Sequence, residues 1–547
     1  MKSFKNVILK PVTNRFFWIV LILNLLSNLV DIKYHHSVFA ILSMVFLSAA
    51  IAYIESSLYV LLTKKVIQKI YAFIIITFHN ILVIIEYVLL INFQMIINQD
   101  AIDILAETNM EETSNFLHSY LPSIWIILLC LCLFFLMNWT IWKLSDKLVK
   151  MHVKWTPFYF ALCGFGILLV CAFNFVKYRN GMSIPQYTTL TRSGYALYNL
   201  RGRLIEIRNL DKICSNLQVT QDIEHKPTIV VVVGESFSVY HSSLYGYEKN
   251  TNPRLSTYVK EGSLVVFDNA ISLFDGTHGS MRADFSLDSL GVDFASKPLF
   301  PACFKAANYH TRMYDNQYFV GSAVTFLSDK QLSETMFDYR NSKRYKYDGF
   351  MVDDIQLSDS LAMYVIHLWG QHYTYSERFP SNFATFKPSD YSTSYSESQR
   401  QIMADYDNAT LYNDFVMDKL FNKLKNLYCC VFYFSDHGEE VYELRDYMGH
   451  GNAAHSSNLN YQIRVPLMVW FSPSFMSENQ QLMKIMQEAK HYPICTDDIG
   501  HSIIDVAGIR TKDFAPTRSF VNPAFNKKRQ RIVLNSINYD KDWLDKQ

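Results

Sequence analysis

Pro227-Thr228-Ile229-Val230-Val231-Val232-Val233-Gly234-Glu235-Ser236 combines an apolar run with a carboxylate directly after it. The run, residues 228–233, is rich in β-branched side chains, does not alternate with polar residues and is too short to cross a bilayer. It is typical of a strand buried on both faces, as in the centre of a parallel α/β sheet. Because such sheets bind ligands at the carboxyl ends of their strands, Glu235 is well placed to hold a ligand or a metal ion. Alternatively, Gly234-Glu235-Ser236 only turns the chain into a helix whose N-cap is Ser236.

The residues that precede this stretch have a different character. The chain has 547 residues and a net charge of +1, which gives no indication of nucleic-acid binding. Long apolar runs dominate its first third, and the residues after about Lys177 have the mixed composition of a globular domain. Five segments are each near the ~20 apolar residues needed to cross a bilayer; they are 16–30 with its flanks, 37–62, 70–93, 121–142 and 157–176. We therefore expect a multi-span α-helical membrane domain, residues 1–176, whose first helix is retained rather than cleaved.

Lysine and arginine residues predict the orientation of these spans. They concentrate before the first span, between the second and third, and between the fourth and fifth, so these segments are expected in the cytoplasm. The opposite loops contain a single lysine, and the longer one, residues 94–120, is acidic. An odd number of spans then places residues 177–547 outside the cytoplasm. Glu55, His79 and Glu86 fall within spans, where ionisable residues are either functional or satisfied polar contacts.

The soluble part alternates strand-like and helix-like segments. After the first strand, apolar β-rich runs recur at residues 264–267, 311–314, 362–368, 427–434 and 465–471, with helical stretches such as 404–426 between several of them. This alternation predicts an α/β domain, residues 227–547, with helices on both faces of a parallel-type sheet. Residues 177–226, which precede it, are predicted to form a connector to the membrane domain. Polar residues just beyond the runs would then meet at one edge: Glu235, Asp275-Gly276-Thr277, Asp315-Asn316, His367, His372 and Ser435-Asp436-His437-Gly438-Glu439.

Two carboxylates and one imidazole in this set suit a catalytic zinc ion. Glu235, Asp436 and His437 would leave one coordination position open. Thr277 is a candidate for that position, because zinc lowers the pKa of a threonine hydroxyl enough for nucleophilic attack. Each residue could also have a purely structural role. Asp436-His437 could form a turn, and Thr277 could be a helix cap or a turn residue. The combination is what favours metal chemistry.

Several motifs resemble those of the phosphoethanolamine transferases, whose soluble domain is sulfatase-like. Residues 233–236, 244–247 and 252–255 resemble the family's GE(S/T)…LYGY…TPxL opening, and residues 367–380 resemble HLxGxHxxYxxRYP. Residues 434–440 resemble xSDHGE, and Gly449-His450 resembles the histidine that follows it. The resemblance covers most of the chain, including the five-span anchor. It implies a sulfatase/alkaline-phosphatase-like fold.

The resemblance also implies a role for each matching residue. The zinc site would consist of Glu235, Thr277, Asp436 and His437, with Thr277 as the nucleophile. His372 and His450 would bind the phosphate and transfer protons. Residues 107–112 are similar to the family's TNxxEA segment, which implies that Thr108 and Glu112 reach the ethanolamine end of the substrate. A carboxylate there would attract the ammonium group.

The implied activity is zinc-dependent transfer of phosphoethanolamine from phosphatidylethanolamine to lipid A, lipopolysaccharide core or another envelope glycan. The implied location is the bacterial inner membrane, with the catalytic domain in the periplasm. A phosphoethanolamine-threonine intermediate would give ping-pong kinetics. The alternatives are a glycerol-phosphate transferase of the lipoteichoic-acid-synthase type and a catalytically silent scaffold.

This chain departs from the family pattern in three ways, one of which is that the disulfide cysteines seen in several members are absent. Around the nucleophile the family usually has GTSTxxSLP, whereas this chain has Gly276-Thr277-His278-Gly279-Ser280-Met281-Arg282. A lysine expected soon after residues 315–317 is also missing. Thr277 is therefore identified by its position, after a glycine that would let the backbone approach the metal, and Ser236 and Ser280 are rival hydroxyls. A sulfatase is disfavoured because the C/S-x-P-x-R arrangement that forms formylglycine is missing from this segment.

Overall fold

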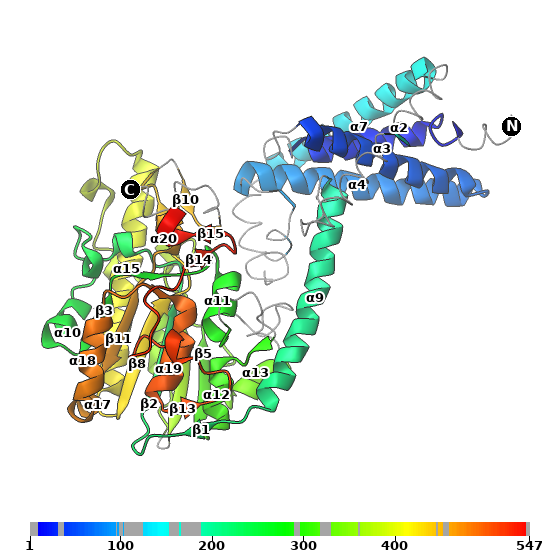
Figure 1. Cartoon of the computed structure of the whole chain (residues 1–547). Helices are drawn as coiled ribbons and strands as arrows, with labels where there is room; N and C mark the ends of the chain where they lie inside the picture. The colour runs from blue at the N-terminus through cyan, green and yellow to red at the C-terminus, as the bar shows by residue number, and fades with distance from the viewer. Residues whose placement is uncertain are drawn as a thin grey trace. The chain divides into compact units, whose positions relative to one another are not determined.

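The structure, a computed structural model, describes residues 9–30, 38–93, 96–97, 102, 124–152, 164–165, 188–288, 296–317, 330–358, 361–444, 447–451 and 459–542. The chain divides into two compact units, residues 1–203 and 204–547, and Figure 1 labels their helices and strands. Each unit has hydrophobic clusters of its own.

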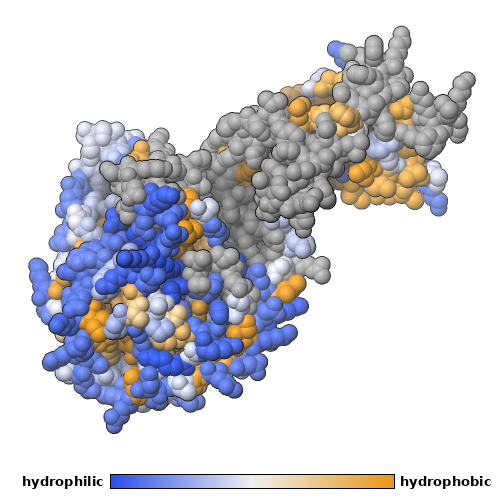
Figure 2. All heavy atoms as spheres, viewed as in Figure 1, coloured by the Kyte–Doolittle hydropathy of each residue, from blue (hydrophilic) through white to orange (hydrophobic). Residues whose placement is uncertain are grey.

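The first unit contains a bundle of long apolar helices. They are α2 (Arg15–Asn28), α3 (Val38–Leu61), α4 (Lys65–Phe93) and α7 (Ile124–His152), and α2 packs against the other three. In the described residues, two helical stretches are long and apolar enough to cross a membrane, 41–61 and 65–90. Large apolar side chains such as Leu61, Val66 and Phe73 are exposed on these helices, and Figure 2 shows orange, hydrophobic surface on this unit.

The described residues do not confirm the prediction of five spans. The first three predicted segments correspond to α2, α3 and α4, and α7 overlaps the fourth. Helix α2 has only 14 residues and is shorter than the predicted span. The predicted fifth segment, 157–176, lies outside the described residues apart from 164–165.

The ionisable residues of these helices contact other polar groups. His79 Nε2 lies 2.9 Å from Glu55 Oε2. Glu86 is fully buried, forms a short ion pair with Arg192 and accepts the Thr189 hydroxyl at 2.7 Å. Arg192 and Thr189 belong to α9 (Thr189–Ser215), the helix that continues into the second unit. Glu86 therefore serves as a satisfied polar contact that attaches the start of α9 to the bundle.

The second unit is built on a seven-stranded sheet with strand order β3-β11-β8-β2-β7-β5-β6. Its strands are β2 (Thr228–Gly234), β3 (Leu264–Phe267), β5 (His310–Asp315), β6 (Tyr339–Arg340), β7 (Ala362–His367), β8 (Cys429–Ser435) and β11 (Leu467–Phe471). The central strand β2 is parallel to both neighbours, β7 and β8. Ile229, Val231 and Val233 enter one hydrophobic cluster, and Val230 and Val232 enter another. Both faces of β2 are thus buried, which explains its unalternated apolar sequence.

Helices cover both faces of this sheet (Figure 1). One cluster includes side chains of α10 (Leu255–Glu261), α14 (Asp348–Asp354) and α15 (Glu397–Leu424). The other includes side chains of α11 (Thr277–Phe285), α12 (Phe300–Ala306), α13 (Lys330–Met336), α17 (Pro473–Glu478), α18 (Gln480–Ala489) and α19 (Ile499–Val506). Two-residue strands pair outside the main sheet: β1 (Thr220–Gln221) with β13 (Ile509–Arg510), β4 (Ala270–Ile271) with β12 (Ile494–Cys495), β9 (Glu440–Val441) with β10 (Met448–Gly449), and β14 (Ile532–Val533) with β15 (Ile537–Asn538).

The prediction of a parallel sheet is wrong at β11, which runs antiparallel to both β3 and β8. Leu467 pairs with Phe434, so the chain enters β11 at the same edge at which it leaves β8. A parallel strand would need a crossover that returns the chain to the other edge. The only helix described between these strands is α16 (Leu459–Ile463), which has five residues. The sheet is therefore mixed.

Candidate active site

The carboxyl ends of β2 and β8 bring Glu235 next to Asp436 and His437. Gly234 is level with Ser435 in the register of these parallel strands, so the residues that follow lie at the same edge. The Asp436 N–H donates to the Gly234 carbonyl at 3.2 Å. His437 Nε2 lies 3.4 Å from Glu235 Oε1 and 3.3 Å from Asp436 Oδ2. All three side chains are completely buried.

Thr277 reaches the same point from a different element. It is the first residue of α11, after the N-cap residue Gly276. Its Oγ1 donates to Glu235 Oε1 at 3.1 Å and lies 3.2 Å from His437 Nε2. The N-terminus of a helix favours negative charge, so a phosphate bound beside Thr277 would be stabilised there.

The spacing of these four side chains fits a tetrahedral zinc ion. Ligand atoms at about 2.0 Å from such an ion lie about 3.3 Å from one another, and the four contacts above measure 3.1 to 3.4 Å. His437 Nδ1 is 2.8 Å from the Gly438 carbonyl, which places a proton on Nδ1 and leaves Nε2 for a metal. Within the described residues, Glu235 Oε2 and Asp436 Oδ2 are buried without a hydrogen-bond partner.

The electrostatics of the cluster also favour a cation. Burial raises the pKa of Asp436 well above its usual range, and the charge of Glu235 adds to this shift. Burial also tends to raise the pKa of Glu235, but the hydrogen bond and charge of His437 hold it well below its usual range. Burial lowers the pKa of His437, and contact with Glu235 more than reverses this. One imidazolium balances only one of the two carboxylates, so a divalent cation would allow both to ionise.

The turn after β7 packs directly on Glu235. The Gln371 N–H donates to the Glu235 carbonyl at 3.0 Å. Asp348 fixes the turn by accepting the N–H groups of Trp369 and Gly370, each at 2.9 Å. Gly370 has φ +49°, and a Cβ there would lie 2.9 Å from both the N and the O of Glu235. Position 370 therefore requires glycine for its conformation and for the close approach.

His372 lies in the same turn and is half-buried. Burial lowers the pKa of His372 to about 4, with the charge of Arg378 acting in the same direction and that of Glu235 opposing it. The imidazole is therefore neutral at neutral pH. A neutral imidazole can donate one hydrogen bond and accept another.

His450 approaches the cluster from the hairpin β9–β10. Its ring centroid lies 4.0 Å from that of His437. Its Nδ1 is 2.6 Å from Glu439 Oε2, and the other oxygen of Glu439 accepts a short hydrogen bond from Tyr375. His437, Glu439 and His450 also form a second group of potential metal ligands, with ligand atoms within 4.8 Å of one another. All the sequence-predicted site residues in the described part of the chain thus gather at one edge of the sheet.

Glu439 and Tyr375 are functional candidates that the sequence did not single out. Glu439 is 1% exposed and contacts His450 directly. It belongs to the polar cluster after β8, and this position in the sequence indicates that it lies near the site. The direction of its side chain depends on the hairpin β9–β10, whose strands of two residues have no detectable periodicity. Tyr375 lies in the segment 367–380 that resembles HLxGxHxxYxxRYP, but nothing in the sequence predicts that it contacts Glu439.

The interpretation of Ser236 as a helix N-cap is wrong. Ser236 has φ +54°, and the following 3-10 helix η2 (Val239–His241) is capped by Ser238, which accepts the Tyr240 N–H. The Ser236 hydroxyl donates instead to Glu235 Oε1 at 3.1 Å. The competing interpretation of this stretch was that Glu235 holds a ligand or a metal ion.

Other predicted residues are not among the four zinc-ligand candidates, and some lie outside the described residues. Ser280 is buried on α11, with its Oγ 2.9 Å from Ser272 Oγ. Asp315 and His367 contact each other at 3.1 Å on the adjacent strands β5 and β7. Gly276 has φ −164°, and a Cβ there would meet nothing within 4 Å, so a glycine is not needed for close approach. Thr108 and Glu112 lie outside the described residues.

The chain is similar to known proteins over this domain and beyond it. A family model described as Sulfatase matches residues 227–509, more than half of the chain. Phosphoethanolamine transferase EptC of Escherichia coli (strain K12) is 28% identical over 325 residues, which cover 56% of this chain and 55% of that protein. Phosphoethanolamine transferase CptA of Salmonella typhimurium is 26% identical over 463 residues, 80% of this chain and 79% of that protein. Kdo(2)-lipid A phosphoethanolamine 7''-transferase of Escherichia coli (strain K12) is 27% identical over 259 residues, 45% of each protein. The chain spans about half the length of the EptC relative.

Two solved structures extend the comparison to the fold. The C-terminal periplasmic domain of EptC from Escherichia coli, in complex with Zn, is 25% identical with a TM-score of 0.54, and the match covers 60% of this chain and 99% of that domain. The integral membrane protein EptA from Neisseria meningitidis is 18% identical with a TM-score of 0.60, over 92% of this chain and 97% of that protein. The second match shows a shared fold across both units.

Proposed function

We propose, on the premise that the chain belongs to the sulfatase family, that it is a zinc-dependent phosphoethanolamine transferase. The donor would be phosphatidylethanolamine, and the acceptor lipid A, lipopolysaccharide core or another envelope glycan. The names of the relatives support the transferred group, and the Kdo(2)-lipid A enzyme supports an acceptor of this class. The observation that carries the proposal is the contact of Thr277 Oγ1 with Glu235 and His437 at zinc-ligand spacing.

Zinc would be held by Glu235, Asp436 and His437, with Thr277 Oγ1 in the fourth position. When bound, zinc would lower the pKa of the Thr277 hydroxyl and stabilise charge on the phosphate oxygens. The buried, unpartnered oxygens of Glu235 and Asp436 support this ligand set. The zinc complex of the EptC periplasmic domain supports the choice of metal.

Thr277 Oγ1 first passes its proton to solvent water. In the first half-reaction its alkoxide oxygen forms a bond to phosphorus, while the bond from phosphorus to the diacylglycerol oxygen breaks. His450, whose Nδ1 is held by Glu439, gives a proton from Nε2 to that leaving oxygen. The neutral His372 donates a hydrogen bond to a nonbridging phosphate oxygen. In the second half-reaction, an acceptor oxygen passes its proton to His450 and displaces Thr277, which leaves phosphorus again as the alkoxide.

The membrane-spanning part completes the proposed enzyme. We place the chain in the bacterial inner membrane, with residues 1–176 as the anchor, 177–226 as the connector and 227–547 as the periplasmic catalytic domain. The two apolar helical stretches at 41–61 and 65–90 support an anchor. Thr108 and Glu112 would contact the ethanolamine group of the donor, since a carboxylate attracts its ammonium.

The full-length protein can be tested with defined lipids and no acceptor. Incubation with phosphatidylethanolamine should release diacylglycerol and add phosphoethanolamine to Thr277, which peptide mass spectrometry would locate. An adduct formed instead from phosphatidylglycerol would favour the glycerol-phosphate alternative. Protein with roughly one zinc ion per chain that forms neither product would contradict the proposed mechanism, and protein that binds no zinc would favour a scaffold.

A further inference from the structure

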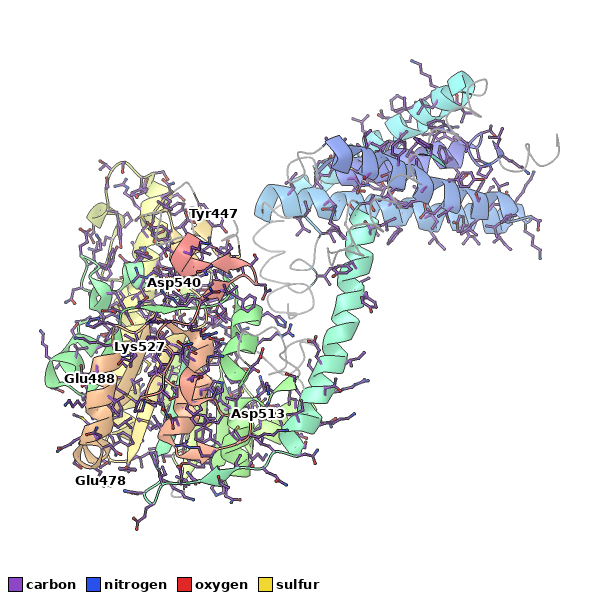
Figure 3. The ribbon with its side chains drawn as sticks, viewed as in Figure 1. Tyr447, Glu478, Glu488, Asp513, Lys527 and Asp540 are labelled. Carbon is purple, nitrogen blue, oxygen red and sulfur yellow. The ribbon has the colours of Figure 1, made fainter. Side chains whose placement is uncertain are left out.

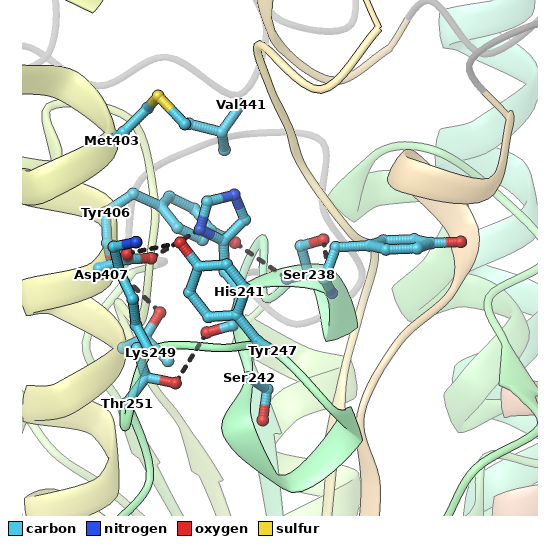
Figure 4. Close-up of polar contacts among 12 residues, drawn as sticks. Ser238, His241, Ser242, Tyr247, Lys249, Thr251, Met403, Tyr406, Asp407 and Val441 are labelled. Atoms are coloured by element: carbon cyan, nitrogen blue, oxygen red, sulfur yellow. Dashed lines mark hydrogen bonds and ion pairs between the residues drawn. The ribbon is translucent and has the colours of Figure 1, made fainter. Parts of the chain in front are cut away.

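His241 joins three elements beside the candidate active site. It is the last residue of η2, six residues after Glu235, and only 2% of its surface is exposed. Its Nδ1 lies 2.6 Å from Asp407 Oδ1 on α15, and its Nε2 lies 3.1 Å from Glu443 Oε1 in the turn after β9. Figure 4 shows Asp407 facing His241. Because each ring nitrogen meets a carboxylate, both nitrogens carry a proton and the ring is a cation.

Other polar and charged groups surround the pair formed by His241 and Asp407. They are Tyr247 and Tyr391, which donate to Asp407 Oδ2 at 2.8 and 2.5 Å, Lys249, which lies 4.6 Å from the Tyr391 ring, and Tyr406, whose ring is 4.8 Å from that of His241. Burial tends to lower the pKa of His241, but Asp407 and then Glu443 raise it to about 10. His241 is therefore protonated over the whole physiological range.

Glu443 and His450 occupy opposite ends of one hairpin. In β9–β10, Val441 pairs with Met448 and Glu440 pairs with Gly449. The next residues outward, Glu439 and His450, contact each other at 2.6 Å. Glu443 lies toward the turn, where it also accepts a short hydrogen bond from the Val441 N–H. The contact with His241 therefore holds the hairpin at its turn, and His450 lies at its base.

We propose that His241 is a positioning residue that, through Glu443, fixes hairpin β9–β10 so that His450 is held against His437. The catalytic part of this inference rests on the proposed function, because that function gives His450 its role as a proton donor and acceptor. His241 itself touches no reacting atom. Its cationic ring forms an ion pair between η2 and this hairpin.

Glu443→Gln in the full chain is the direct test, because it weakens the contact at the hairpin and leaves His241 paired with Asp407. Glu443 is 17% exposed, so this variant should fold even where His241→Gln does not. We expect kcat to fall about tenfold, as for other partners that orient active-site ligands. Zinc content should stay unchanged, since the proposed ligands lie after β2 and β8 and on α11.

A double-mutant cycle with His450→Ala separates positioning from general stabilisation. If Glu443 acts through His450, Glu443→Gln should not lower kcat any further in the His450→Ala background. An equal loss in both backgrounds would overturn the inference. His225→Gln is the matched control, because His225 Nδ1 also contacts a carboxylate, Glu478 Oε2, at 2.6 Å. Figure 3 shows Glu478 at the opposite end of this unit from Tyr447, which lies next to β10. This control should retain wild-type kcat.

Hydrogen exchange provides a readout that does not depend on activity. In Glu443→Gln, backbone amides of residues 439–444 and 447–450 should exchange faster than in the wild type, while those of β2 and α15 should not change. Unchanged exchange in the hairpin would overturn the inference whether or not the protein transfers phosphoethanolamine. The two proposals can fail separately. If hairpin amides exchange faster in Glu443→Gln but the wild-type protein forms no phosphoethanolamine adduct, the positioning role of His241 is supported and only the proposed function is contradicted.

Discussion

The Thr277 hydroxyl contacts two candidate zinc ligands from the half-buried start of α11, so we expect its removal to disturb the chemistry more than the packing. Thr277 is half-buried, and the side chains of α11 that enter the hydrophobic cluster are Met281 and Phe285. We expect Thr277→Ala to lower head-group transfer by more than ~10³-fold, because the covalent step is removed rather than weakened. Transfer from labelled phosphatidylethanolamine would be measured beside circular dichroism, which should stay unchanged.

Ser280→Ala is the control for that substitution. Ser280 lies one turn further along the same helix, and its hydroxyl contacts Ser272 Oγ at 2.9 Å and the Phe274 carbonyl at 3.3 Å. Loss of this buried contact should reduce stability by about 1 kcal/mol and leave most of the activity. An adduct mapped to Ser280, or transfer that survives in Thr277→Ala, would reject Thr277 as the nucleophile.

The sequence predicted those site residues whose position follows from a strand end. Glu235, Asp436 and His437 directly follow apolar runs, and parallel pairing of β2 with β8 is sufficient to bring them together. The sequence was less informative where a contact depends on a turn. It misassigned Ser236 because a positive φ at a serine has no composition signal, and it missed the contact of Glu439 with His450 because that contact depends on a short hairpin.

Among the elements, the sheet was predictable to the level of strand location but not of strand direction. The six predicted strands all occur, with ends within one or two residues of those expected. Direction could not be read for β11, since a strand buried on both faces has the same apolar sequence whichever way it runs. The connection decides direction, and the described residues between β8 and β11 form a hairpin and a helix of five residues, which the sequence does not indicate.

The turn after β7 offers a test of how one element positions a ligand on another. Gly370→Ala would place a Cβ 2.9 Å from the Glu235 backbone at a position with φ +49°. We expect it to displace Glu235, to cost on the order of 1–3 kcal/mol of stability and to lower zinc affinity by about tenfold or more. Competition with a chromogenic chelator would measure that affinity.

Gly276→Ala is the matched substitution for this measurement. A Cβ at Gly276 would meet nothing within 4 Å, and its φ of −164° is extended backbone that alanine adopts. Zinc affinity should therefore equal that of the wild type. Equal zinc affinity in Gly370→Ala and Gly276→Ala would show that the turn does not position Glu235.

The ion pairs of His241 predict a specific dependence of stability on pH. The pKa of His241 is raised to about 10 in the folded protein, compared with about 6.5 in an unfolded chain. Its stabilisation is therefore complete below pH of about 6.5 and is lost as the pH rises through about 10. The difference in melting temperature between the wild type and His241→Gln should shrink steadily from pH 7 to pH 10. A difference that is constant or grows over this range would show that His241 is not held as a cation.

At the scale of the whole molecule, the first unit indicates on which side of a membrane the chain continues. At the start of α2, Arg15 Nε donates to Ser145 Oγ at 3.1 Å, and the guanidinium lies 3.4 Å from the Trp142 ring of α7. At the other end of α2, Asn28 accepts the Thr189 N–H at 2.7 Å. A helix of 14 residues is about 20 Å long. Helix α9 therefore begins at the end of the bundle opposite to Arg15.

This arrangement agrees with the distribution of basic residues and gives a prediction for topology. The described lysines before α2, between α3 and α4 and after residue 142 would share the end of Arg15, which the positive-inside rule places in the cytoplasm. Because α9 starts at the opposite end, residues 204–547 should lie outside the cytoplasm. A reporter that is active only outside the cytoplasm, such as alkaline phosphatase, should therefore work when fused after Gln547, and a reporter that is active only in the cytoplasm should not. The same pair of reporters fused after Lys64 should give the reverse result. Activity of the cytoplasmic reporter after Gln547 would contradict the orientation and would separate the proposed catalytic domain from envelope acceptors.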